Sequence, residues 1–278
     1  MPIRLLIADV DGTLVTKKKT VTPRTRAAAE RLRAAGVAFT VTSGRPPRGL
    51  TGLVEALELT APLAAFNGAI YIRPDMRTVL VQRTIPPDVA RGAVDYLLRS
   101  GVDVWVYCGA EWFLRDASAF RVERETRTVG FSPTVVPDLH QVLGAALKIV
   151  AVSADPSLTA RCEQELQAHL GADAWAARSN ASYVDITHRD ANKGMVVRDA
   201  SRIFNIPFDE IATIGDMPND IPMLALAGVG IAMGNASKDV QSVARHVTTS
   251  NDDDGFANAV EHFILADRVD SEAATPPL

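Results

Sequence analysis

The stretch LLIADVDGTLV, Leu5 to Val15, decides the first element of the fold. Four apolar residues enter a buried strand, and two carboxylates, Asp9 and Asp11, then stand on either side of one valine. Because alternate residues of an extended segment face the same way, both carboxylates can address one ligand. An acidic pair followed by Gly12 is equally consistent with an ordinary turn. The stretch therefore predicts a buried strand that ends either in a turn or in a binding site.

The composition is that of an ordinary globular protein. The chain has 278 residues, 47% of them hydrophobic, which is enough to bury a full core in one large or two modest domains. A formal net charge of -4 gives no chain-wide basic field for nucleic acid or anionic membranes. The apolar runs are shorter than the roughly 20 residues that span a bilayer. We therefore expect no nucleic-acid or membrane partner.

The cysteines and the first residues indicate the compartment. Cys108 and Cys162 are the only cysteines, and they form no metal-binding pattern; the first residues lack the longer apolar region and the cleavage site of a signal peptide. We therefore predict a cytoplasmic protein with free thiols. The Asn-Ala-Ser sequons at Asn180 and Asn235 are then chance matches.

Short apolar runs alternate with helix-like segments, which is the pattern of a parallel sheet covered on both faces. Between the first two runs, Thr22 and Pro23 open a helix and Gly36 ends it, so this part forms a βαβ unit. Core strands are predicted at 4–8, 38–42, 63–66, 211–214, 228–232 and 246–247.

The middle of the chain has a different pattern, in which strands and helices read as an α+β insert. Its strands are predicted at 102–108, 111–115, 146–152 and 181–186, and its helices at 87–100 and 156–170. The predicted fold class is α/β, with a Rossmann-like doubly wound parallel sheet as its core and an inserted cap. The predicted domains are the core at 1–83 and 189–266, the cap at 84–188, and a disordered tail at 267–278.

Polar clusters follow several of the predicted core strands. After the Asp9 pair come TSGR at 42–45, NGA at 67–69 and GDMPND at 215–220. Because open parallel sheets bind ligands at the carboxyl ends of their strands, these loops should meet in one crevice. No single cluster carries this prediction, which depends on all of them lying at strand ends.

Two residues later in the chain point to phosphate and a metal. Lys193 stands in the first turn of a helix predicted to open near Asn192, where the helix dipole disfavours a cation. A bound anion would resolve that conflict, and an exposed lysine is the alternative. Asp216 directly follows a buried strand and suits Mg²⁺, which takes one or two protein carboxylates together with phosphate oxygens. Ser43 and its neighbouring amides could hold a phosphate oxygen.

The motifs DVDGTL, TSGR, NKG and GDMPND, in this order, resemble those of the haloacid dehalogenase-like (HAD) hydrolases, in particular their Cof-type sugar-phosphatase branch. The insert between the serine and lysine motifs resembles the α/β cap of that branch. The resemblance implies a Mg²⁺-dependent phosphatase that hydrolyses a small phosphorylated metabolite, such as a sugar phosphate, through an aspartyl-phosphate intermediate. Met217 stands where the family often has serine, a departure that alters no implied role.

The resemblance also implies the role of each motif residue. Asp9 would be the nucleophile, and Asp11 the general acid and base. The implied metal ligands are Asp9, Asp216, Asp220 and the backbone carbonyl of Asp11. The implied phosphate-binding residues are Ser43, Gly44, Lys193 and Asn219. Further candidates for contact with the substrate are Arg45, Asn67, Arg178 and Asn180.

Other functions remain open at this point. A sugar phosphomutase of the same superfamily would use the same motifs and return the phosphoryl group to a sugar. A receiver-like signalling module would also gather acids, a hydroxyl and a lysine around Mg²⁺, but in a much shorter single domain without a cap. Dinucleotide binding is disfavoured because GVGIAMG lacks the GxGxxG spacing. The sequence indicates neither the individual substrate nor the oligomeric state.

Overall fold

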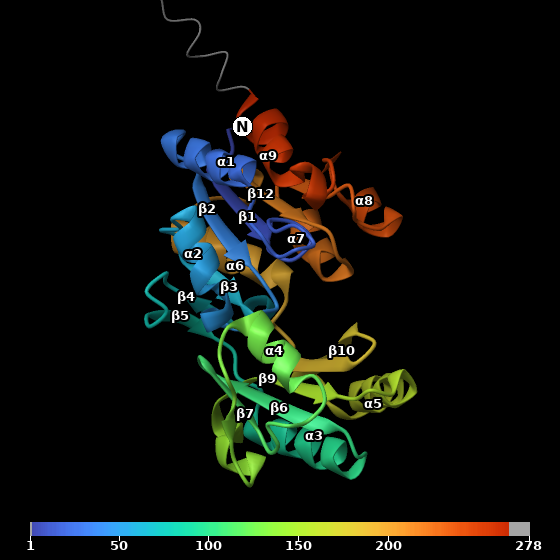
Figure 1. Ribbon diagram of the computed structural model, residues 1–278. Coiled ribbons are helices and arrows are strands. Elements are labelled where there is room, and N and C mark those ends of the chain that lie inside the picture. Colours follow the sequence, from blue (N-terminus) through green and yellow to red (C-terminus); the bar gives the residue numbers. More distant parts are fainter. Residues whose placement is uncertain (1, 267–278) are drawn as a thin grey trace, which may run out of the picture. The chain divides into compact units, whose positions relative to one another are not determined.

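The computed structural model describes residues 2–266, so the predicted tail at 267–278 lies outside the described residues. The chain forms two compact units (Figure 1). The first comprises the segment up to Ser43, Gly52–Ala64 and the segment from Asn192; the second comprises Gly44–Thr51 and Ala65–Ala191. The predicted cap at 84–188 falls within the second unit, and its limits stay a prediction. Between residues 2 and 266, no helix has the length and apolar character needed to cross a membrane.

A parallel sheet forms the centre of the first unit. Hydrogen-bonded neighbours follow the order β14-β13-β12-β1-β2-β3. From β1 the chain adds β2 and β3 on one side of the sheet, and it later returns to add β12 on the other side of β1. The topological switch point therefore lies at the boundary between β1 and β12. The strands are β1 (Leu5–Asp9), β2 (Ala38–Thr42), β3 (Leu63–Ala65), β12 (Ile211–Gly215), β13 (Val229–Ala232) and β14 (His246–Val247).

Both faces of this sheet are covered. Successive strand residues point to opposite faces, yet every residue of β1 and of β12 is buried. Helices α1 and α9 contact each other, and so do α6 and α7. The predicted doubly wound α/β core is therefore confirmed. The helices are α1 (Pro23–Ala34), α2 (Thr51–Leu57), α6 (Lys193–Phe204), α7 (Ile221–Leu226), α8 (Lys238–Val243) and α9 (Gly255–Ala259).

Side-chain caps fix the starts of two of these helices. The Thr22 side chain accepts a hydrogen bond from the amide of Thr25 at the start of α1, and the Asn192 side chain accepts one from Met195 at the start of α6. Both residues satisfy an amide that the first helical turn leaves without a partner. The cap at Asn192 makes Lys193 the first helical residue.

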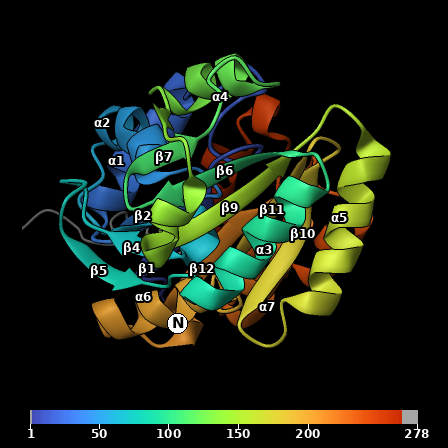
Figure 2. The ribbon, with the colours of Figure 1, turned by 90° about the horizontal axis from the view of Figure 1, so that it is seen from below.

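The second unit has a mixed sheet with helices on one face. Its strand order is β10-β11-β9-β6-β7-β8, and Figure 2 shows α3 and α5 side by side over the same face of the sheet. Strands β4 and β5 do not belong to this six-stranded sheet and pair with each other as an antiparallel hairpin. The strands are β4 (Ile70–Ile72), β5 (Val79–Gln82), β6 (Asp103–Cys108), β7 (Glu111–Leu114), β8 (Thr134–Val135), β9 (Ala146–Val152), β10 (Ala174–Asn180) and β11 (Tyr183–His188); the helices are α3 (Pro87–Arg99), α4 (Val122–Val129) and α5 (Pro156–His169).

The elements that sequence patterns did not predict are short or poorly buried. Strand β5 is largely exposed, and β10 buries only two of its seven residues. The sequence VERETRTV of α4 carries four charges and buries only its first and last residues. Such segments lack the apolar periodicity from which a helix or strand can be recognised.

Candidate active site

A buried lysine joins two of the predicted site carboxylates. The Lys193 ammonium lies 2.6 Å from Oδ1 of Asp9 and 2.5 Å from Oδ1 of Asp220. Asp9 ends β1 and Lys193 begins α6, and all three side chains are almost completely buried. The alternative of an exposed Lys193 is therefore wrong. A buried ammonium that donates to two carboxylates is a fixed positive charge at the carboxyl edge of the sheet.

The turn after β12 brings Asp216 and Asp220 together. Oδ2 of Asp220 accepts hydrogen bonds from the amides of Asp216 and Met217, each at 2.9 Å. Gly215 permits this closure, because a Cβ there would lie 2.5 Å from the Asp220 carboxyl carbon. Asp220 thus holds both the lysine and the loop that carries Asp216.

Three of the predicted metal ligands form one carboxylate group. Asp9, Asp216 and Asp220 each offer an oxygen, all within 4.8 Å of one another, and all three residues are buried. Asp11, whose predicted contribution is a backbone carbonyl, adds no carboxylate to this group. An all-oxygen donor set suits a hard divalent cation such as Mg²⁺, Ca²⁺ or Mn²⁺. The residues therefore fit a divalent metal of this type.

Charge imbalance shifts the protonation of this group. The pKa of Asp9 is raised to about 7, because burial and the charges of Asp220 and Asp216 together outweigh the opposing effect of Lys193. Burial and the charge of Asp220 likewise raise the pKa of Asp216 to about 6. Burial lowers the pKa of Lys193, but its two carboxylate partners outweigh it and leave the pKa raised, so the ammonium stays charged. Lys193 alone does not neutralise the three carboxylates, and a divalent cation would supply the missing positive charge.

Asp11 lies in different surroundings from Asp9. Its side chain is half-buried, and Oδ1 is paired with the Lys19 ammonium at 2.5 Å. Asp9 is instead enclosed, with an ammonium that it shares with another acid. Two carboxyl groups in such different surroundings can carry out different chemistry.

Gly12 brings the turn after β1 against Asp216. Its φ of +89° is a left-handed conformation, and a Cβ at this position would lie 2.3 Å from Oδ2 of Asp216. The next residue, Thr13, donates from its hydroxyl to Oδ1 of Asp216 at 3.2 Å. Glycine is therefore required here both for the backbone conformation and for the close approach.

The predicted phosphate-binding residues lie in both units. Ser43 follows Thr42, the β2 partner of Asp9, and is buried, with its amide bonded to the Ala64 carbonyl at 3.0 Å. Ser43 thus lies at the same sheet edge as Asp9. Asn219 is exposed, in the turn that Asp220 closes. Gly44 belongs to the second unit.

The four candidate substrate residues belong to the second unit. A Cβ on Gly44 would lie 3.6 Å from the Asn67 amide, and Asn67 has a φ of 56°. Arg45 donates to the Gly49 carbonyl at 3.4 Å. On β10, Arg178 pairs with Glu163 at 2.8 Å, and Asn180 accepts from the Ser182 amide at 2.8 Å. These contacts are local, and the substrate roles stay predictions.

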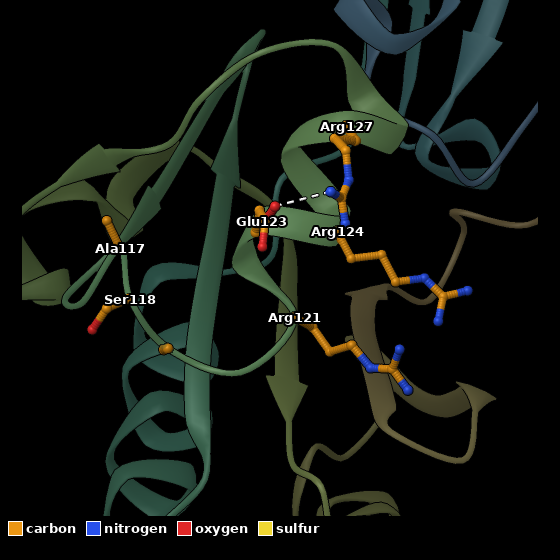
Figure 3. A pocket seen from close by; sticks show the side chains of 7 residues that line it. Ala117, Ser118, Arg121, Glu123, Arg124 and Arg127 are labelled. Atoms are coloured by element: carbon orange, nitrogen blue, oxygen red, sulfur yellow. Dashed lines mark hydrogen bonds and ion pairs between the residues drawn. The ribbon is translucent and has the colours of Figure 1, made fainter.

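The second unit also presents an arginine cluster that sequence patterns did not predict. Figure 3 shows Arg121 and Arg124, at the start of α4, extended toward the same side, whereas Arg127 turns to Glu123 at 2.9 Å. Arg121 also lies over the Phe120 ring, with its guanidinium carbon 4.9 Å from the ring centroid. The cluster therefore adds exposed positive charge to this unit.

Sequence analysis missed three residues of the site. Thr13 and Asn235 donate hydrogen bonds to Asp216, and Asn251 contacts Asn235. Asn235 belongs to a chance sequon match, yet it lies in the loop after β13, and Asp216 likewise follows the neighbouring strand β12. The rule that polar residues gather after parallel strands could have identified it.

Comparisons with known proteins give a consistent result. The family model described as haloacid dehalogenase-like hydrolase matches residues 6–260. A 5-amino-6-(5-phospho-D-ribitylamino)uracil phosphatase of Bacillus subtilis is 28% identical, over 93% of this chain and 97% of its own. A pyridoxal phosphate phosphatase of Escherichia coli is 25% identical, over 95% and 100%. The crystal structure of a haloacid dehalogenase-like hydrolase from Bacteroides thetaiotaomicron superposes with a TM-score of 0.86 at 26% identity, covering 93% of this chain and 98% of that one.

Proposed function

The chain belongs to the haloacid dehalogenase-like hydrolases, and on that premise we propose that it is a Mg²⁺-dependent phosphatase of a small phosphorylated metabolite that works through an aspartyl phosphate. The family and the named relatives confirm the predicted enzyme class, a phosphoric monoester hydrolase. The match over residues 6–260 is at odds with a receiver-like module of a single short domain.

One observation supports the mechanism above all others. Asp9 is a buried carboxylate whose Oδ1 is held by Lys193, and a second carboxylate, Asp11, follows two residues later in a more open position. A nucleophile must be held still, and a group that moves protons must be reachable. The two aspartates fit these two requirements.

The proposed reaction has two steps. The Asp9 carboxylate attacks phosphorus, the bond from phosphorus to the substrate oxygen breaks, and the Asp11 carboxyl gives its proton to the leaving alcohol. The Asp11 carboxylate then takes a proton from water, which attacks the aspartyl phosphate and releases inorganic phosphate with Asp9 restored. The protein's acids and water thus account for every proton transferred.

Fixed positive charge supports both steps. Lys193 would meet the charge on the phosphoryl oxygens, and Ser43, Gly44 and Asn219 would donate hydrogen bonds to them. Asp9, Asp216 and Asp220, with the Asp11 carbonyl, would hold Mg²⁺. When bound, Mg²⁺ supplies Lewis-acid stabilisation of charge on the phosphoryl oxygens.

The substrate class is proposed from the enzyme class and the named relatives. The two phosphatases above act on different phosphorylated metabolites, and both are similar to this chain along nearly its full length. Sugar phosphates are the class that the sequence motifs favour. Arg45, Asn67, Arg178 and Asn180 remain the proposed contacts with the leaving group.

Release of inorganic phosphate tests the proposal. The purified protein should hydrolyse p-nitrophenyl phosphate with Mg²⁺ and lose that activity with EDTA. A panel of hexose phosphates, phosphoglycolate, pyridoxal phosphate and FMN then ranks substrates. Asp9→Asn should abolish turnover, whereas Glu58→Gln, on an exposed side chain paired with Arg33, should not change it. Full activity of Asp9→Asn would exclude the nucleophile, and transfer of phosphate from glucose 6-phosphate to another hydroxyl would favour the mutase.

A further inference from the structure

An asparagine outside the four motifs holds the loop of Asp216 against the turn after β1. The Asn235 side-chain amide donates to Oδ2 of Asp216 at 3.2 Å and to the carbonyl of Gly12 at 3.0 Å. One NH₂ group therefore links the segment after β12 to the segment after β1. These two segments flank the topological switch point, where the carboxylate group lies.

The orientation of the Asn235 amide is itself fixed. Its Oδ1 accepts a hydrogen bond from the backbone amide of Asn251 at 3.0 Å, so the NH₂ group must point the other way, toward Asp216. Asn251 is buried, and its own side chain donates to the Val15 carbonyl at 2.8 Å. The segment after β14 thus orients Asn235 and also holds the turn that follows β1.

The loop that carries Asn235 is held in place as well. The Gln241 side-chain amide donates to the carbonyls of Met233, Gly234 and Ala236 at 3.1 to 3.4 Å. The backbone at Gly234 packs closely against the segment after β14, because a Cβ at this position would lie 2.9 Å from the Ser250 amide nitrogen. Asn235 is solvent-exposed, yet its position and orientation are both determined.

With Thr13, Asn235 gives Asp216 a donor on each oxygen. The Thr13 hydroxyl reaches Oδ1 and the Asn235 amide reaches Oδ2. Each carboxylate oxygen has two lone pairs, so one neutral donor on each leaves capacity for a metal ion. The two donors together fix the plane of the carboxylate.

We infer that Asn235 is a positioning residue for the metal site, which sets the orientation of Asp216 and thereby the affinity for the divalent cation. The inference rests on the metal site of the proposed function. Groups that hydrogen-bond a metal ligand typically change metal affinity or activity by about 10- to 100-fold when they are removed. Because Asn235 is exposed and water can replace part of its role, we expect about tenfold, the lower end of that range.

Metal binding without substrate provides the direct test. Calorimetric titration of the metal-free protein with Mg²⁺ should show a dissociation constant about tenfold higher for Asn235→Ala than for the wild type. Asn235→Ser, whose hydroxyl is too short to reach Asp216, should show the same shift and serves as a second variant. Asn258→Ala is the matched control, because Asn258 donates to Thr249 and to the Asp253 carbonyl in the same part of the chain without touching Asp216.

Kinetics separate positioning from a general loss of structure. With p-nitrophenyl phosphate, the Mg²⁺ concentration for half-maximal activity should rise in both Asn235 variants, while kcat at saturating Mg²⁺ stays within about twofold of the wild type. A lower melting temperature with an unchanged Mg²⁺ dissociation constant would overturn the inference, as would a wild type that binds no Mg²⁺. A protein that binds Mg²⁺ with this Asn235 dependence but releases no phosphate would overturn the proposed function instead.

Discussion

Each unit contains a cluster of charged side chains, and the two clusters differ in their charge balance. In the first unit, Asp9, Asp216 and Asp220 face one ammonium, that of Lys193. In the second, Lys148 pairs with Asp185 at 2.7 Å, and both side chains are mostly buried. Burial raises the pKa of the neighbouring Glu125, which accepts a hydrogen bond from the Tyr107 hydroxyl at 3.4 Å. Lys148 and Asp185 therefore match one cation with one anion, whereas the first cluster has three anions for one cation.

This difference indicates which cluster needs a ligand. A balanced buried pair can offset much of the cost of leaving water by its own attraction. Three carboxylates and one lysine carry a net charge of two negative units, which no group in the cluster offsets. Protons or a divalent cation must then compensate, because burial and the neighbouring carboxylates raise the pKa values of Asp9 and Asp216.

The largest expected effect comes from removing the cation of the first cluster. Lys193→Met leaves Asp9 and Asp220 without their shared donor, so we expect turnover of p-nitrophenyl phosphate to fall by about 10²- to 10³-fold. The metal-free protein should also lose about 3 kcal/mol in its free energy of unfolding, because breaking a buried pair leaves uncompensated charge. Steady-state kinetics and urea unfolding provide the two measurements.

The same substitution in the second cluster is the control. Lys148→Met should lower the free energy of unfolding while leaving the Mg²⁺ dissociation constant unchanged, because Lys148 does not belong to the carboxylate group. If Lys148→Met lowered turnover as strongly as Lys193→Met, the contrast between the clusters would be wrong.

The next effect comes from the close approach at Gly12. Gly12→Ala places a Cβ 2.3 Å from Oδ2 of Asp216, so the carboxylate must move and the Mg²⁺ dissociation constant should rise by tenfold or more. Gly36→Ala is a matched control, because its φ is also positive, at +69°, but a Cβ there meets nothing within 4 Å. Both variants should lose about 1–2 kcal/mol from the backbone conformation. Equal Mg²⁺ affinity in the two would contradict the role of Gly12.

Sequence patterns predicted the elements whose physical signals are local. The cap at Thr22, the cap at Asn192 and the apolar run of β1 are each readable within a few residues, and each lies where it was expected. The same holds for polar residues after parallel strands, because the carboxyl ends of such strands share one edge. From these signals, the sequence predicts that Asp9, Lys193 and Asp216 lie in one site.

The features that sequence patterns missed depend on residues far apart in the chain. Thr13 and Asp216 are 203 positions apart, and Gly12 and Asn235 are 223 positions apart. Nothing near Asn235 in the sequence indicates that its amide is oriented by the backbone of Asn251. A contact of this kind follows from the register of the sheet and the closure of its loops, which a single sequence does not display.

A smaller effect concerns pH and metal. The folded-state pKa values of Asp9 and Asp216, about 7 and about 6, lie above the ordinary 3.8. The stability that their protonation contributes is therefore complete below about pH 4 and is lost as pH rises through 6 and 7. Mg²⁺ binds the ionised carboxylates, so its stabilising effect should be larger at pH 8 than at pH 5. The difference between the melting temperatures with Mg²⁺ and with EDTA measures this stabilising effect. An equal difference at pH 5 and pH 8 would contradict the raised pKa values.

The smallest effect is expected where the charges are already balanced. Asp185→Asn keeps the shape of the side chain and removes one charge from its pair with Lys148, so we expect the free energy of unfolding to fall by about 2 kcal/mol. Because no carboxylate of the first cluster changes, the rise in melting temperature that saturating Mg²⁺ produces should equal that of the wild type. Thermal and urea unfolding, each with and without Mg²⁺, separate the two quantities. A smaller Mg²⁺ effect in Asp185→Asn would show that the second cluster also takes part in binding the cation, and charge balance alone would then not distinguish the two units.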